Sequence, residues 1–413
     1  MTNNLEDAQN SEPNIAVNPV DPTQIMISAF GSAQPEKFFL SKDGGATWGK
    51  FPGVSASDAS LAWSGNGKVY LARLSGSGTA MCVFKQRSPT LPGAVFVPIA
   101  ASNYVPGGEG PDQPWIETAT VAGRDRIYVA FNDLSQPVKT ASVRFSLDSG
   151  ATWQNTIIER TNPPDNQDGS AVRIKALGER VYAAFQRFNA VDANGNESGD
   201  IVVVRDDAGG TGKFKALGTN GVGVIAAANE SLPQNRLGSE RLGSDLSIAI
   251  DPSNSSRVAV AFAAISGGGP VVVVRLSTNA GATWQEVHTT PASSALPAVA
   301  IAANGTIALL YTKYDGTNIE THLIQSANNF STSVDETLSR FANASLPVEF
   351  QPFIGDYEDL VAVENTFYGT FSASNDVNAF SITPVMLRDK TMLGNGVPFS
   401  IDPFFFKSPA LLP

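Results

Sequence analysis

Acidic residues recur just before a series of short apolar segments, and their type and spacing suit proton-transfer chemistry. We take five of them as candidate catalytic residues, with Glu12 in the corresponding place near the start of the chain: Asp58, Asp112, Asp168, Asp245 and Asp356. Neighbouring carboxyl groups raise one another's pKa, which suits general acid catalysis, and they are also ligands for Ca²⁺. The alternative is that each Asp caps the N–H groups of its own loop.

A second group of polar residues lies where other segments end. The candidate substrate-binding residues are Arg73, Asp133, Arg187, Tyr314, Tyr357 and Asn375. Charged and amide side chains bind sugar hydroxyls through paired hydrogen bonds, and the flat ring of Tyr stacks on a sugar face. Polar residues are also the ordinary content of surface loops, which is the competing interpretation.

A repeat of strand-like hexamers predicts the elements that position these residues. Seven such segments follow one another at spacings of 44 to 77 residues, beginning at Ile25, Val69, Ile127, Val181, Val258, Ile307 and Phe367. Each follows a shorter apolar segment and a turn marked by Gly, Asn or Pro. The sequence therefore predicts a single all-β domain over 1–413, with a short N-terminal extension at 1–11 and an insertion at 219–243. The spacing of the hexamers fits a β-propeller of four-stranded antiparallel blades, seven in number, with six as the alternative.

One turn occurs three times almost unchanged, as Ser41-Lys-Asp-Gly-Gly-Ala-Thr-Trp48, Ser146-Leu-Asp-Ser-Gly-Ala-Thr-Trp153 and Ser277-Thr-Asn-Ala-Gly-Ala-Thr-Trp284. The Asp or Asn and the hydroxyl groups suit capping of turn N–H groups, and Gly suits a positive φ. We assign structural roles to the residues at the four defining positions: Ser41, Asp43, Gly45, Trp48, Ser146, Asp148, Gly150, Trp153, Ser277, Asn279, Gly281 and Trp284.

The pattern Ser-x-Asp-x-Gly-x-Thr-Trp resembles the Asp-box, or BNR repeat, of the sialidase-like β-propellers. In that family the box lies at the blade periphery, away from the active site. The resemblance implies a glycan bound in the axial funnel and, if the protein is an enzyme, a glycoside hydrolase of exo-sialidase type. The sequence departs from the family in having seven units and in lacking an early Phe/Tyr-Arg-Ile-Pro segment, to which Val172-Arg-Ile174 is the nearest fragment. Tyr357 and Glu358 are adjacent, so on a strand they would point to opposite faces.

Composition narrows the partners and the location. The net charge of −11 argues against nucleic acid and anionic membranes as partners. The sequence contains no run of 18 apolar residues, so it predicts no membrane insertion. Cys82 is the only cysteine, while His288 and His322 lie too far apart in the pattern for a zinc site. The N-terminal residues lack a signal peptide, so either the protein is not exported by that route or the peptide has been removed; we expect an extracellular or cell-surface location. No cofactor is required, with Ca²⁺ as an option, and the oligomeric state is left open.

Two hypotheses follow from the sequence. In the first, a sialidase-like propeller recognises, and also hydrolyses, a glycan or glycoprotein in its axial funnel. In the second, the same scaffold is a non-catalytic module, lectin-like or protein-binding. The Asp-box pattern does not separate them, because a fold does not fix a function.

Overall fold

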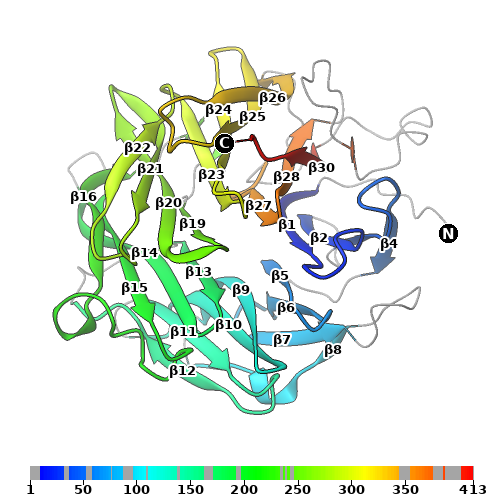
Figure 1. Ribbon diagram of the computed structural model, residues 1–413, viewed down its shortest axis with the longest axis vertical. Coiled ribbons are helices and arrows are strands. Elements are labelled where there is room, and N and C mark those ends of the chain that lie inside the picture. The colour runs from blue at the N-terminus through cyan, green and yellow to red at the C-terminus, as the bar shows by residue number, and fades with distance from the viewer. Residues whose placement is uncertain are drawn as a thin grey trace.

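The strands of the protein form seven four-stranded sheets arranged as blades around one axis (Figure 1). The computed structural model describes residues 10–31, 37–52, 58–75, 77–86, 96–107, 110–136, 140–161, 171–191, 197–232, 236–237, 240–241, 246–343, 354–374, 385–386 and 401–412. In these residues the helices are the short 3₁₀ segments η1 (Ala100–Ser102) and η2 (Thr219–Gly221). None of the described helices has the length and apolar character to cross a membrane. The predicted seven-bladed all-β propeller is confirmed.

Blades 1 to 6 each use four consecutive antiparallel strands, counted outward from the axis. Blades 1 to 3 contain β1 (Asn10–Val17), β2 (Ile25–Gly31), β3 (Lys37–Ser41), β4 (Gly49–Pro52), β5 (Ala59–Trp63), β6 (Val69–Leu74), β7 (Met81–Gln86), β8 (Phe96–Pro98), β9 (Pro111–Val121), β10 (Arg124–Asp133), β11 (Thr140–Ser146) and β12 (Gln154–Ile157). Blades 4 to 6 contain β13 (Val172–Leu177), β14 (Arg180–Val191), β15 (Glu197–Asp206), β16 (Val224–Leu232), β19 (Leu246–Asp251), β20 (Asn254–Ser266), β21 (Gly269–Ser277), β22 (Gln285–Thr289), β23 (Ser294–Ile301), β24 (Ile307–Tyr314), β25 (Asn318–Ser326) and β26 (Val334–Ala342). A separate hairpin pairs β17 (Arg236–Leu237) with β18 (Glu240–Arg241).

The predicted hexamers are the second strands of the blades, and the shorter segments before them are the innermost strands. In blade 2, for example, Val69 at the start of β6 pairs with Trp63 at the end of β5. Residues Val69 to Ala72 are all fully buried, because the sheet packs against a neighbouring blade on each face. Alternate residues therefore fill two different inter-blade cores, which explains why these strands are apolar along their length rather than alternating.

Blade 7 closes the ring by a different route. Its strands are β27 (Asp359–Val363), β28 (Thr366–Ser374), β30 (Ile401–Pro409) and β29 (Val385–Met386) in order from the axis, so the last strand of the chain lies third. Phe405 in β30 packs edge-on against Trp48 of blade 1, with 5.1 Å between ring centres. Lys407 donates to the carbonyl oxygen of Gly44 at 3.0 Å. The C-terminal strand therefore completes blade 7, and side chains close the ring against blade 1.

The three repeated turns have one hydrogen-bond pattern. In the second copy, Ser146 Oγ accepts from Gly150 N at 2.8 Å, Asp148 Oδ1 accepts from Thr152 N at 2.8 Å, and Trp153 Nε1 donates to the Gly150 carbonyl at 3.0 Å. The bonds from Thr152 lower the pKa of Asp148 to about 2. Each copy joins the third and fourth strands of its blade, so it lies at the end of the propeller opposite to the first residues of the inner strands.

Candidate functional site

The inner strands of four blades begin with an unusual backbone conformation. Left-handed φ angles occur at Glu12 (51°), Asp58 (43°), Gln113 (47°) and Leu296 (55°). In β1 and β23 the pairing register with the next strand shifts at this point. A β-bulge re-aims the side chains beside it, and non-glycine residues in this region carry backbone strain. These bulged strand beginnings therefore present selected side chains at one end of the axis. We call this end, where Glu12, Asp58, Asp112 and Asp356 lie, the acidic mouth.

Two residues after each of these positions lies an inner-strand residue whose side chain contacts the next blade. Together with the equivalent residues of the other blades, they form a layer that we call the axial layer: Asn14, Ser60, Trp115, Arg173, Ser247, Ala298 and Asp359. Four of them accept a hydrogen bond from the backbone of the next blade, namely Asn14 Oδ1 from Leu61 N (2.6 Å), Ser60 Oγ from Ile116 N (2.9 Å), Ser247 Oγ from Val299 N (3.0 Å) and Asp359 Oδ2 from Ile15 N (3.0 Å). The layer thus joins successive blades and divides the axial space into two ends.

An arginine and two aromatic rings form the floor of the mouth. The Arg173 guanidinium lies 4.2 Å from the ring centre of Trp115 and 5.7 Å from that of Tyr357. The two rings meet edge to face at 5.6 Å. Arg173 is only 4% exposed, so its charge is held against aromatic faces and is largely withdrawn from solvent. A small depression of about 10 Å³ lies over these residues and also contacts Asp356 and Glu358.

Three of the predicted acids meet at this mouth, although they come from different blades. Asp58 is hydrogen-bonded to the carboxyl group of Asp112 and accepts a bond from the backbone N–H of Gln113. Burial, followed by the charge of Asp112 and the bond between the two carboxyl groups, raises the pKa of Asp58 to about 7, and the charge of Asp356 adds to the effect. Glu12 accepts a bond from the backbone N–H of Asp356 at 3.2 Å. The mouth therefore brings carboxyl groups from several blades together, and one of them, Asp58, has a pKa near neutral.

Two further carboxyl groups lie below them at the start of β27. Glu358 is 2% exposed and accepts a bond from Thr312 Oγ1 at 2.9 Å. Asp359 accepts bonds from Asn14 Nδ2 (2.8 Å), Ile15 N (3.0 Å) and Leu360 N (2.9 Å). Burial raises the pKa of Asp359 to about 6 against the attraction of Lys175 and Arg173. These bonds tie blade 7 to blade 1 beneath the mouth.

Other predicted site residues are engaged within their own regions. Asp133 is fully buried and accepts from Tyr104 Oη at 2.7 Å, while Arg187 forms an ion pair with Glu159 at 2.8 Å. Tyr314 donates to the carbonyl of Gly316 at 2.7 Å. The guanidinium of Arg73 lies 4.6 Å from the ring centre of Phe84. None of these four lines the depression at the mouth, and their part in substrate binding stays a prediction.

The remaining predicted residues, Asp168, Asp245 and Asn375, lie outside the described residues. Within the described ranges, no three His, Cys, Asp or Glu side chains are grouped as a metal site, and the Ca²⁺ option stays a prediction. Sequence reasoning missed Arg173 and Gln113 as parts of the mouth. A usable signal was the proline that follows three of the four left-handed residues, Pro13, Pro114 and Pro297.

Comparison with known proteins gives the fold. No protein-family model matches the chain, and no curated protein matches its sequence. Two ulvan lyase structures from a new polysaccharide lyase family, one bound to GlcA(1-4)Rha3S, are similar at TM-scores of 0.54 and 0.55, with 12% and 11% identity over 88% of this chain and 92% of theirs. An α-L-arabinofuranosidase of Fusarium graminearum in complex with arabinobiose has a TM-score of 0.48 and 10% identity, over 96% of this chain and 93% of the other. The chain is a seven-bladed β-propeller whose fold resembles that of glycan-processing enzymes.

Proposed function

We propose that the acidic mouth binds a glycan and that Asp58 and Asp112 supply the proton for its hydrolysis. The observation that carries the proposal is the hydrogen bond between these two carboxyl groups beside the aromatic pair Trp115 and Tyr357. Carboxyl groups with raised pKa transfer protons at neutral pH, and aromatic rings pack against sugar faces. The likeness of fold to a polysaccharide lyase is consistent with this proposal, as is the expected extracellular or cell-surface location.

The hydrogen bond between Asp58 and Asp112 favours a division of roles among three acids. Glycosidases place their two carboxyl groups about 5–5.5 Å apart when they retain configuration and about 6.5–9.5 Å apart when they invert it. Asp58 and Asp112 are hydrogen-bonded, which is closer than either arrangement. We therefore assign the pair as one proton donor. Asp356, which contacts the depression at the mouth, is the second carboxylate, acting as base or nucleophile.

The charge of the mouth favours a glycan without a carboxylate. In the part of the chain that the structure describes, Arg173 is the one arginine that contacts the depression, and it already lies against two rings. Clamping a carboxylate takes convergent guanidinium groups, whereas here Glu358 and Asp356 face the same depression. We propose a neutral oligosaccharide in preference to a sialoside. Glu358 accepts a bond from Thr312, so a Tyr357–Glu358 nucleophile pair is not part of the proposal.

A non-catalytic lectin is the second candidate, and the shallowness of the mouth favours it. The depression over Arg173 and Trp115 measures about 10 Å³, so a sugar would lie across the rim rather than in a deep pocket. A surface of this shape suits recognition of an internal stretch of a chain.

The test is a screen of the purified protein on an array of neutral and acidic glycans, with each bound glycan then incubated and its products analysed. Asp112→Asn and Asp356→Asn are the test variants. Asp148→Asn, in a turn at the opposite end, is the matched control. We expect binding to a neutral glycan and cleavage that falls by about 100-fold or more in the test variants, the usual range for loss of an acid or base.

Each outcome is informative. Binding without cleavage selects the lectin candidate, and unchanged cleavage in both test variants removes the assigned roles. Preference for sialosides contradicts the charge argument. If no glycan on the array binds, glycan recognition is contradicted, and the protein-binding scaffold is the remaining hypothesis.

A further inference from the structure

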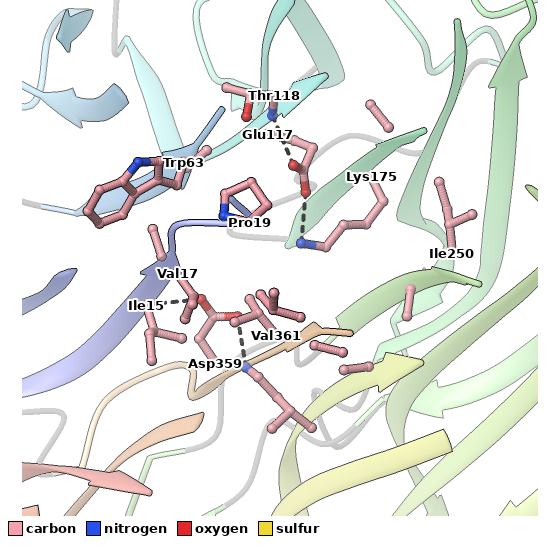
Figure 2. Close-up of a pocket in the computed structure, with 18 of the residues that line it drawn as sticks. Ile15, Val17, Pro19, Trp63, Glu117, Thr118, Lys175, Ile250, Asp359 and Val361 are labelled. Carbon is pink, nitrogen blue, oxygen red and sulfur yellow. Dashed lines mark hydrogen bonds and ion pairs between the residues drawn. The ribbon is translucent and has the colours of Figure 1, made fainter. Parts of the chain in front are cut away.

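The other end of the axis contains a cavity of a different kind, which we call the axial cup. It has a volume of about 330 Å³ and is lined by all seven inner strands (Figure 2). Most of the residues that line it have apolar side chains, among them Val17, Pro19, Trp63, Ile250 and Val361. The volume is within the range of small-molecule sites, which is about 300–1,000 Å³.

The cup opens at the turns between the first and second strands. Pro19, Gly65 and Pro252, which belong to these turns, line the cavity and are exposed. The axial layer closes the opposite end, because Asn14, Trp115 and Asp359 contact the cavity from above. The cup is therefore a blind pocket with an apolar wall and a polar floor, and it faces away from the acidic mouth.

The floor contains the charged side chains. Glu117 and Lys175 point toward one another in Figure 2, with 2.8 Å between Oε2 and Nζ. Both keep contact with the cavity, since their side chains are 17% and 27% exposed. Glu117 Oε1 also accepts a bond from Thr118 N at 2.9 Å. Asp359 completes the group from blade 7, although its oxygens are occupied by three bonds to Asn14, Ile15 and Leu360.

Among the described residues of the lining, these three are the charged ones, and together they carry one positive and up to two negative charges. Lys175 is already paired with Glu117, so an anion would have to displace that carboxylate and would face Asp359 as well. A cation can share Glu117 with Lys175, because this carboxylate is 17% exposed and has lone pairs beyond its bonds to Lys175 and Thr118. Charged groups are favourable in apolar surroundings only when they are paired, so the floor selects by charge.

We propose that the axial cup is a binding site for a small amphiphilic primary amine. The ammonium group donates to Glu117 beside Lys175, and the branched apolar tail lies along Val17, Trp63 and Val361. This inference is independent of glycan binding at the mouth, because the two sites lie on opposite sides of the axial layer.

The experiment compares three probes of nearly equal shape, isopentylamine, isopentanol and isovalerate, by ligand-detected NMR and calorimetric titration at pH 7.5. We expect the amine to bind about tenfold or more tightly than the alcohol or the acid, because a hydrogen bond between two charged groups is stronger than one between neutral groups. Glu117→Gln should reduce amine affinity by about tenfold, because it keeps the shape and removes the charge.

Two further variants keep the outcome interpretable. Val361→Phe narrows the cup without touching its charges and should abolish binding of the amine. Asp112→Asn, at the mouth, should leave amine binding unchanged. Tighter binding of isovalerate, equal binding of all three probes, or no binding of the amine at millimolar concentration would each overturn the proposal.

Discussion

The two ends of the axis are built from the same seven inner strands, yet they differ in backbone and in chemistry. At the acidic mouth, four strands begin with a left-handed residue, and carboxyl groups from blades 1, 2, 3 and 7 converge. At the axial cup, none of the strand residues that line the cavity has a left-handed φ, and the strands leave a space of about 330 Å³. The comparison indicates that left-handed strand beginnings direct polar groups to one end of the axis, whereas the other end keeps a cavity.

The axial layer separates the two ends, and mutations in it should lower the free energy of unfolding most. Asp359→Ala removes the acceptor for three N–H donors and leaves Lys175 with less compensation in a buried setting. We expect the free energy of unfolding to fall by roughly 3–5 kcal/mol, as for the loss of one member of a buried charged group. Urea denaturation measures it, with Asp356→Ala at the partly buried rim as the control. A loss equal to that of the control would show that the layer does not hold the two ends together.

The mouth should also give the protein a pH-dependent stability that the cup walls cannot. The folded-state pKa of Asp58 is raised, so the folded protein binds the proton more tightly than the unfolded chain. Its contribution is neutral below about pH 4 and becomes increasingly destabilising as the pH rises from about 4 to about 7. Asp58→Asn should therefore gain stability relative to the wild type by roughly 1–3 kcal/mol between pH 4.5 and pH 7.5.

Chemical denaturation at several pH values checks this prediction. Asp112→Asn should reproduce part of the same gain, because it removes the neighbouring charge and leaves Asp58 in place. Asp43 and Asp148 have pKa values lowered to about 2. Their contribution to the pH dependence of the unfolding free energy therefore lies below about pH 4, outside the range from pH 4.5 to pH 7.5. A parallel pH dependence in the wild type and in Asp58→Asn would contradict the assignment.

Two glycine substitutions in β9 should give the smallest changes in unfolding free energy. They compare the acidic mouth and the axial cup within one strand. Gln113 is left-handed (φ 47°) at the mouth, and Thr118 lies in regular strand beside the cup. Gln113→Gly should change the unfolding free energy by less than about 0.5 kcal/mol, because relief of the left-handed backbone offsets the added freedom of the unfolded chain. Thr118→Gly should cost about 1 kcal/mol or more. Equal costs would mean that the bulge carries no strain.

The sequence predicted the repeating part of this molecule well and the mouth only in part. Apolar hexamers such as Val69 to Leu74 could be read as second strands because every blade buries them in the same way. That Asp58 touches Asp112, while Asp133 turns to Tyr104, depends on bulges and loops whose geometry no local pattern encodes. Arg173 was noticed only as a fragment of a family motif, and its position over Trp115 follows from the meeting of blades 3 and 4.

The closure of the ring has a consequence for the molecule as a polymer. Blade 1 takes its four strands from residues 10–52 and blade 7 from residues 359–409, so no sheet of the described chain is shared between the two ends of the sequence. Their interface consists of side chains such as Ile15, Val17, Tyr368 and Phe405. Separation of blade 1 from blade 7 would therefore break side-chain packing and hydrogen bonds such as that from Ile15 N to Asp359, but no strand ladder.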